Sequence, residues 1–157
     1  MTSNKPAPVA IVMGSKSDRT VMIECKKVLN YFRICFKEFI LSAHRTPKAT
    51  AKFAENAEKE GYKILIAAAG MAAHLPGVLA ASTTLPVIGV PMPTSNLNGL
   101  DALYSIVQMP SGVPVATVAI GSAGAANAAV LAAQILAIED ADIKAKLIKF
   151  KEQGCRI

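Results

Sequence analysis

Hydrophobic and polar positions fall in blocks along the chain that predict strands alternating with helices. Short runs dominated by apolar residues predict strands buried on both faces at 9–13, 62–68, 86–90 and 114–120. A further strand is expected at 34–41, where apolar and polar residues alternate. The spacing of apolar residues predicts helices over 19–32, 47–60, 99–108, 122–138 and 140–153, and a short helix is expected to begin near 74–76.

This order of elements predicts the fold class. Strands that alternate with helices form parallel sheets covered on both faces, so we expect a three-layer α/β/α sandwich. The sheet is expected to be five-stranded, parallel and flavodoxin-like. No linker or repeat interrupts the 157 residues, which are enough to bury a core. We therefore expect a single domain over 1–157, with a catalytic α/β core at 8–138 and a C-terminal helix and tail at 139–157.

The distribution of charge narrows the choice of partners. The net charge is +6, but the 17 Lys and Arg residues form no basic run and the chain has no Trp, which argues against nucleic-acid binding. Between residues 64 and 138 the only formally charged residue is Asp101. Such a stretch implies burial against other subunits or a membrane. Glycines and prolines interrupt its apolar runs well short of a membrane span, so the sequence favours a closely packed homo-oligomer.

Cysteine usage and the polar start of the chain bear on the compartment. Cys25, Cys35 and Cys155 show no metal-ligand spacing, and the two histidines lie thirty residues apart without an evident third ligand. No metal site is expected. Residues 1–8 are polar and lack the apolar core of a signal peptide. The three thiols are therefore expected to be reduced and structural, in a cytoplasmic protein.

The segment Ser42-Ala43-His44-Arg45-Thr46-Pro47 is the most informative motif of the chain. It lies between a predicted strand and a predicted helix, where open α/β proteins bind ligands. Thr46 suits an N-cap and Pro47 the first helical turn. The loop offers an imidazole that can give or take a proton, and a guanidinium suited to phosphate. It therefore indicates proton transfer on a phosphorylated substrate, although a histidine bonded to backbone beside a solvated arginine remains the alternative.

Two other loops follow strands and should emerge at the same sheet edge. In Gly14-Ser15-Lys16-Ser17-Asp18, the hydroxyls and amides could hold a phosphate and Asp18 could accept from ribose hydroxyls, or Asp18 could be a plain N-cap. In the segment 69–77, small residues around Gly70 and Met71 would leave an uncharged pocket near His74. The alternative there is a packing corner in which His74 is a satisfied core histidine.

Together these loops resemble one enzyme family. Val-Met-Gly-Ser-Lys-Ser-Asp (12–18), Ser-Ala-His-Arg-Thr-Pro (42–47) and Ala-Ala-His-Leu-Pro-Gly (72–77) resemble the bacterial class I N5-carboxyaminoimidazole ribonucleotide mutases, the PurE family. The likeness covers roughly 9–138. It implies a cofactor-free isomerisation in purine biosynthesis, in which a carboxylate moves from the exocyclic nitrogen of the ribonucleotide to ring carbon 4.

The resemblance also implies a role for each matching residue. His44 would be the acid and base, Ser15 and Arg45 would hold the 5′-phosphate, Asp18 would bind the ribose, and Ser42 and Ala43 would line the base site. Gly70, Met71 and His74 would border the pocket for the migrating carboxylate. Met71 stands where the family usually has a second glycine.

The resemblance further implies an octamer, and a functional link to the ATP-dependent synthetase that makes the substrate. Two other functions stay open. The related class II carboxylases use CO2 and the non-carboxylated ribonucleotide, although Arg45-Thr46-Pro47 after His44 favours class I. A non-catalytic nucleotide-binding module on the same fold is the second, because fold alone does not determine function.

Overall fold

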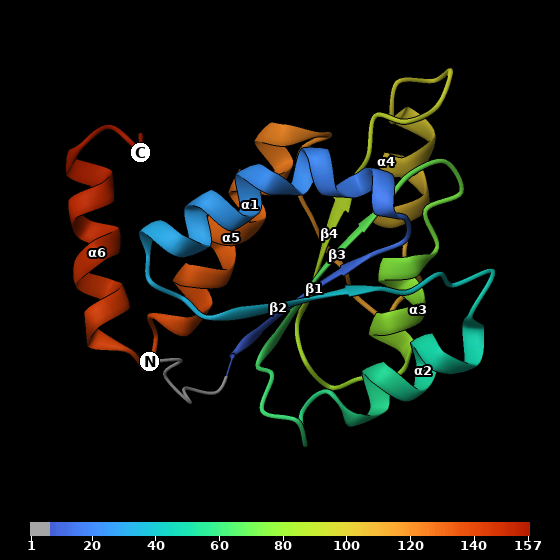
Figure 1. The fold of residues 1–157 in the computed structure, drawn as a ribbon, viewed down its shortest axis with the longest axis horizontal. Helices are drawn as coiled ribbons and strands as arrows, with labels where there is room; N and C mark the ends of the chain where they lie inside the picture. Colours follow the sequence, from blue (N-terminus) through green and yellow to red (C-terminus); the bar gives the residue numbers. More distant parts are fainter. Residues whose placement is uncertain (1–6) are drawn as a thin grey trace.

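The computed structural model describes residues 7–157 and shows one parallel sheet with helices on both faces (Figure 1). Residues 1–6, part of the polar start for which no signal peptide is predicted, lie outside the described residues. The elements follow in the order β1 (Val9–Met13), the 3-10 turn η1 (Lys16–Asp18), α1 (Arg19–Tyr31), β2 (Phe36–Ile40), α2 (Pro47–Asn56), β3 (Ile64–Ala69), α3 (Leu75–Ala81), β4 (Val87–Pro91), α4 (Leu100–Val107), β5 (Ala116–Thr117), α5 (Ser122–Leu136) and α6 (Ala141–Glu152).

The strand order confirms the predicted fold class. The sheet has the order β2-β1-β3-β4-β5 and every pairing is parallel. This is the flavodoxin-like order, in which the chain reverses its direction across the sheet between β1 and β3. Ligands of such sheets bind outside the carboxyl ends of the strands at that reversal, so the topology itself predicts where a site should lie.

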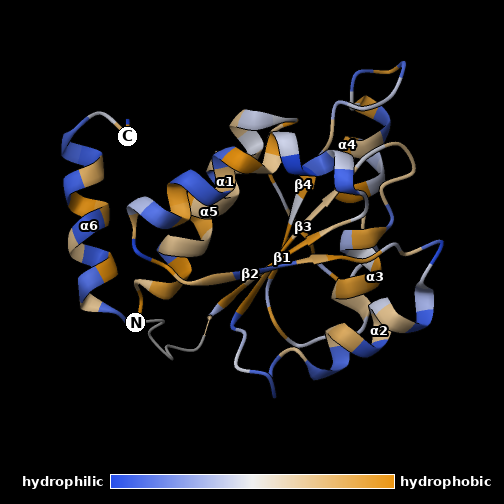
Figure 2. Cartoon of the chain, viewed as in Figure 1, coloured by the Kyte–Doolittle hydropathy of each residue, from blue (hydrophilic) through white to orange (hydrophobic). Residues whose placement is uncertain are grey.

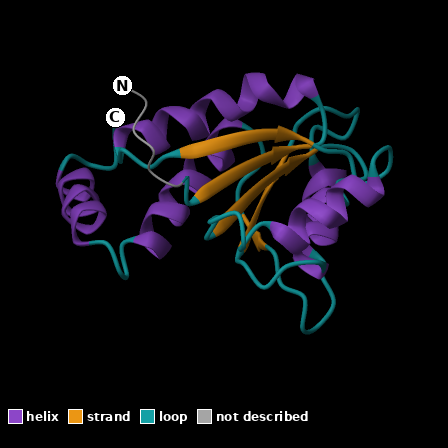
Figure 3. Ribbon diagram, turned by 60° about the horizontal axis from the view of Figure 1, so that its bottom comes forward, coloured by secondary structure: helices purple, strands orange, loops and turns teal. Residues whose placement is uncertain are grey.

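Figure 3 shows helices on both faces of the sheet. Two separate hydrophobic clusters, one on each face, hold these three layers together. Alternate residues of each inner strand point to opposite faces of the sheet. Val9, Ile11 and Met13 of β1 pack with α1, α5 and α6, whereas Ala10 and Val12 pack with α2, α3 and α4. This division explains why β1, β3 and β4 are apolar at every position and fully buried.

The edge strands show why the sequence pattern is less decisive there. Strand β2 has the sequence FKEFI, with two exposed charged residues, and shows less hydrophobic colour than β3 and β4 in Figure 2. The fifth strand was expected over 114–120, but only Ala116–Thr117 pair with β4. Beyond this pairing, Val118 N donates to Gly89 O at 3.1 Å and Gly121 N donates to Pro91 O at 2.9 Å, so the chain still follows β4 without forming a longer strand. Helix α2 also ends early, at Asn56, before the predicted Glu60.

Helix α5 packs closely against α1, as its eight alanines between 122 and 138 predict (Figure 1). Its buried positions are nearly all small: Gly124, Ala125, Ala128, Ala129, Ala132, Ala133 and Leu136. Cys25 of α1 lies inside this layer, and burial raises the pKa of its thiol to about 12, which makes it a structural thiol. Cys35 and Cys155 are exposed free thiols, so neither belongs to the core of the single chain. No helix within 7–157 has both the length and the apolar character to cross a bilayer.

Candidate active site

Three loops meet at the carboxyl edge of the sheet because the strand ends are in register. Met13 pairs with Ile40 of β2 on one side and with Ala68 of β3 on the other. Two backbone bonds continue this register past the strands: Leu41 N donates to Met13 O, and Gly14 N donates to Ala68 O, each at 3.0 Å. The loops that follow β1, β2 and β3 therefore begin side by side.

The loop after β1 is a compact turn stabilised by Ser15 and Asp18. Ser15 is the N-cap of η1 and its Oγ accepts from Ser17 N at 3.3 Å, while Asp18 Oδ2 accepts from Ser15 N at 3.0 Å. This reciprocal pair is a capping box. Asp18 stands at the N-cap position of α1, but its side chain makes no capping bond there. The interpretation of Asp18 as a plain N-cap is therefore wrong, because its carboxylate reaches back into the loop.

The loop after β2 is held by hydroxyl groups. Ser42 N donates to Thr46 Oγ1 at 3.0 Å, and Arg45 N donates to Ser42 Oγ at 3.1 Å. The buried Thr50 donates its hydroxyl to Ser42 O at 3.2 Å. Thr46 is at the N-cap position and Pro47 in the first turn, as predicted, but the Thr46 hydroxyl bonds Ser42 and does not cap α2. These bonds fix the backbone on both sides of His44 and leave its ring free to reach the third loop.

His44 and His74 bring the second and third loops into direct contact. His44 Nε2 lies 2.7 Å from His74 Nδ1, and the ring planes cross at 82°. Both residues are exposed. His74 precedes α3 and is not the satisfied core histidine that was the alternative, nor is the His44 ring bonded to backbone. The structure thus places the only two histidines of the chain in one hydrogen bond.

Met71 occupies a backbone conformation that glycine adopts more readily. Its φ is 56°, in the left-handed region, and its side chain is 61% exposed. A residue with a β-carbon is locally strained in this conformation. The sequence expectation that a second glycine usually stands here therefore has a physical reason, and the exposed Met71 is one of the residues that line the cavity.

The predicted site residues all line one cavity of about 480 Å³. The loop after β1 provides Ser15 and Asp18, the loop after β2 provides Ser42, Ala43, His44 and Arg45, and the loop after β3 provides Gly70, Met71 and His74. The sequence motifs therefore identified residues that share a cavity, although they come from three separate segments.

Thr94 is a lining residue that the sequence analysis missed. It follows β4, the next strand beyond β3, and a β-carbon added to Gly70 would lie 2.0 Å from its hydroxyl oxygen. Gly70 therefore allows Thr94 to close against the pocket wall. The strand order could have identified Thr94, because in the order β2-β1-β3-β4 the loop after β4 also begins at this edge of the sheet. Gly14, Ser17, Ala69, Ala72 and Leu75 complete the lining.

The cavity combines charged, proton-exchanging and hydrogen-bonding groups. Arg45 is its cation, Asp18 its carboxylate, and His44 and His74 its titratable rings. Hydroxyls and amides of the first loop add hydrogen-bonding groups. Within 7–157 no three His, Cys, Asp or Glu residues are grouped closely enough to hold a metal ion.

Asp18 should make the stability of the protein depend on pH. Burial raises the pKa of its carboxyl above the usual 3.8, against the lowering effect of the Ser15 backbone bond. The folded state therefore keeps this proton to higher pH than the unfolded chain does. The contribution of Asp18 to stability is largest at acid pH and declines as pH rises from 3.8 through the folded pKa. Asp18→Asn should remove this decline, because the amide oxygen still accepts from Ser15 N.

Urea unfolding from acid to neutral pH measures this effect. The free energy of unfolding of Asp18→Asn relative to the natural chain should rise with pH. Asp140→Asn is the matched control, because Asp140 is an exposed N-cap of α6 and asparagine caps helices equally well. If the free energy of unfolding changed with pH in the same way for Asp18→Asn and the natural chain, the inference that burial raises the pKa of the Asp18 carboxyl would be wrong.

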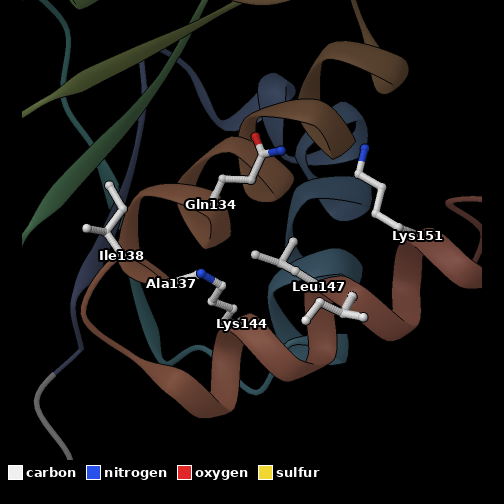
Figure 4. A pocket seen from close by; sticks show the side chains of 7 residues that line it. Gln134, Ala137, Ile138, Lys144, Leu147 and Lys151 are labelled. Carbon is white, nitrogen blue, oxygen red and sulfur yellow. The ribbon is translucent and has the colours of Figure 1, made fainter.

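A second hollow, of about 290 Å³, lies between α5 and α6 (Figure 4). Aliphatic residues and two lysines line it: Gln134, Ala137, Ile138, Lys144, Leu147, Ile148 and Lys151. It contains none of the predicted site residues, and it is not at the carboxyl edge of the sheet. The predicted site residues all lie in the cavity formed by the three loops.

Fold and site together define an open α/β protein with a cavity at the carboxyl edge of a parallel sheet, the place where such folds bind small molecules. The family model described as AIR carboxylase matches residues 8–156. A Haemophilus influenzae protein named N5-carboxyaminoimidazole ribonucleotide mutase is 55% identical over 149 residues, which cover 95% of this chain and 91% of that protein. A Saccharolobus solfataricus protein of the same name is 56% identical over 144 residues, which cover 92% of this chain and 90% of that protein.

The crystal structure of Treponema denticola PurE superimposes on this chain with a TM-score of 0.84 at 30% identity, covering 94% of this chain and 90% of that one. The chain belongs to the AIR carboxylase family.

Proposed function

We propose that the chain is an N5-carboxyaminoimidazole ribonucleotide mutase, an isomerase of purine biosynthesis. It moves the carboxylate from the exocyclic nitrogen to ring carbon 4 and yields 4-carboxyaminoimidazole ribonucleotide. The observation that carries this proposal is the convergence of His44, Arg45 and Asp18 with the uncharged Gly70 segment in one cavity. Two relatives that bear the mutase name, at 55% and 56% identity, support it.

His44 is the proposed acid and base. It protonates the exocyclic nitrogen as the carboxylate leaves, and later removes the proton from carbon 4. The proton lost by carbon equals the proton gained by nitrogen, so the reaction needs no net acid or base. General acid–base assistance of this kind contributes typically about 10²–10⁴ in rate.

The other residues hold the substrate still while this happens. Ser15 and Arg45 bind the 5′-phosphate, Asp18 accepts from the ribose hydroxyls, and Ser42 and Ala43 border the base. Hydrogen-bonded loops support these roles, because the bond from Arg45 N to Ser42 Oγ at 3.1 Å fixes the backbone that carries the guanidinium. Fixed contacts to phosphate and ribose keep the ring oriented while the carboxylate is in transit.

The pocket for the migrating carboxylate lies by Gly70, Met71 and His74. The bond between nitrogen and CO2 is labile, so the difficulty is to retain CO2 until carbon 4 attacks it. Ala69, Gly70 and Ala72 line this part of the cavity and contribute no charged side chain. Uncharged walls that exclude water suit the retention of CO2.

A paired ultraviolet assay tests the proposal. Formation of 4-carboxyaminoimidazole ribonucleotide is followed without ATP or added metal, from the N-carboxylated substrate at low bicarbonate and from the non-carboxylated one with bicarbonate. Fast turnover of only the first is the expected result. Turnover of only the second would assign a CO2-using carboxylase, and turnover of neither a binding module.

The same proposal includes a closely packed homo-oligomer, with an octamer as the expected state. Support comes from the stretch 64–138, whose single formal charge is Asp101, and from exposed apolar residues on it such as Ile138, 82% exposed, and Tyr104, 57% exposed. Light scattering at nanomolar concentration should detect multimers. Monomers at that concentration would contradict the proposal.

The remaining parts of the proposal concern the setting of the enzyme. Residues 8–138 would form the catalytic core, with 139–157 as an added helix and tail. The exposed thiols of Cys35 and Cys155 fit the reducing environment of the cytoplasm. The substrate would come from the ATP-dependent synthetase that carboxylates the exocyclic nitrogen.

A further inference from the structure

The hydrogen bond between His44 and His74 restricts how many protons the two rings can hold. His44 Nε2 and His74 Nδ1 lie 2.7 Å apart, so one of them must donate and the other accept. Two N–H groups cannot face each other at this distance. The doubly charged pair is therefore incompatible with the observed contact, and the pair holds at most three ring protons while the bond persists.

The same contact determines which nitrogen of each ring stays available to a ligand. His44 Nδ1 and His74 Nε2 have no protein hydrogen-bond partner within the described part of the chain. In the neutral pair, one of these outer nitrogens carries a proton and the other is bare, because each ring has a single proton and one proton lies in the bridge. The pair thus presents an acid and a base at the same time. The two roles are exchanged when the bare outer nitrogen takes up a proton, the bridging proton crosses to the other ring, and that ring releases its outer proton.

We propose that His44 and His74 act as one proton-sharing pair, in which His74 is the positioning residue that sets the tautomer of His44 and shares the positive charge of the ring before the proton is given and after it is taken back. This inference rests on the proposed function and gives His74 a role through His44, beyond bordering the carboxylate pocket. The pair starts with three ring protons and gives one from His44 Nδ1 to the exocyclic nitrogen. It takes one back from carbon 4, and the bridging proton lets the rings share the charge.

The surroundings leave the pair free to do this. The other titratable or charged groups that line the cavity are Asp18 on the first loop and Arg45 beside His44. Neither makes a hydrogen bond to either ring among the described residues. The carboxylate of Asp18 is instead engaged by Ser15 N at 3.0 Å. The shared proton is thus governed chiefly by the two rings.

Kinetics of His74→Asn provide the first test. Asparagine can place a hydrogen-bonding group near the position of Nδ1 but cannot carry the proton. We expect kcat to fall by about 10- to 100-fold, less than the ~10²–10⁴ expected for loss of the acid and base itself. KM should change little, because His74 is proposed to act through His44 and not by binding the substrate. The pH profile should also change shape, because coupled groups titrate as a pair and a single ring does not.

A double-mutant cycle distinguishes the pair from two independent residues. If His74 acts through His44, His44→Asn/His74→Asn should be no slower than His44→Asn alone. If the loss of kcat in the double variant equalled the product of the losses in the two single variants, the proposal would be overturned. His74 would then be a separate contact to the substrate carboxylate. An inactive natural chain would instead refute the proposed function, so the two failures are distinguishable.

Imidazole nitrogen NMR of the natural chain tests the pair without any turnover. The signals of both rings should shift together as pH changes, and in His74→Asn the His44 signals should follow a simple one-proton curve. Independent titration of the two rings in the natural chain would overturn the inference whatever the kinetics show.

Discussion

Replacement of His44 by asparagine should reduce kcat by about 10²–10⁴ while the ribonucleotide still binds. Asparagine is compact and polar, so it can occupy the loop without collapse, but it cannot exchange a proton. The backbone on both sides of His44 is held by Ser42 and Thr46, and the side chain is exposed, so the fold should be unaffected. Turnover is measured by the ultraviolet assay, and binding by calorimetry.

Arg45→Ala is the matched comparison, because it alters the next residue of the same loop. A charged hydrogen bond to phosphate contributes about 1.5–3 kcal/mol, which corresponds to roughly 10- to 100-fold in affinity. Arg45→Ala should therefore raise KM by about that factor and leave kcat nearly unchanged. If His44→Asn kept most of its kcat, or if Arg45→Ala kept its affinity, the corresponding assignment would be wrong.

The fold was largely predictable because the inner strands carry an unambiguous pattern. Buried parallel strands such as 9–13 need apolar residues on both faces, and helices between them need one apolar face. That logic weakens at the sheet edges, where one side of the strand meets solvent. The paired part of β5 is confined to Ala116–Thr117, although a strand was predicted over 114–120, whereas the other edge strand, β2, pairs over all five of its residues.

The site was predictable as three loops, but its internal contacts were not. Parallel strands end at one edge, so the loops near Ser15, His44 and Gly70 had to lie together. The bond between His44 and His74 depends on the register of Met13 with Ile40 and Ala68, which no single segment contains. Thr94 was missed because its loop carries no motif and reaches the cavity only through the neighbouring position of β4.

Gly124→Ala should destabilise the protein by at least about 3 kcal/mol, the high end of overpacking effects. An added β-carbon would lie 1.6 Å from the carbonyl oxygen of Ala119 and 2.6 Å from its carbon. The clash is with backbone, so no rotamer change relieves it. The segment that carries Ala119 is held to β4, through Val118 N to Gly89 O at 3.1 Å and Gly121 N to Pro91 O at 2.9 Å. Either these bonds or the packing of α5 on α1 must yield.

The expected sign is opposite to that of helix propensity, which makes the measurement decisive. Within an ordinary helix, alanine is more stable than glycine by about 1 kcal/mol. Gly112→Ala is the control, because a β-carbon there meets nothing within 4 Å but must adopt a φ of 92°. It should cost about 1–2 kcal/mol. Urea unfolding should give Gly124→Ala a clearly lower free energy of unfolding than Gly112→Ala. All variants are measured at equal protein concentration, because subunit association would add to stability. A Gly124→Ala protein as stable as the natural chain would mean that α5 can move away from Ala119, and that the close packing of α5 is not required for the fold.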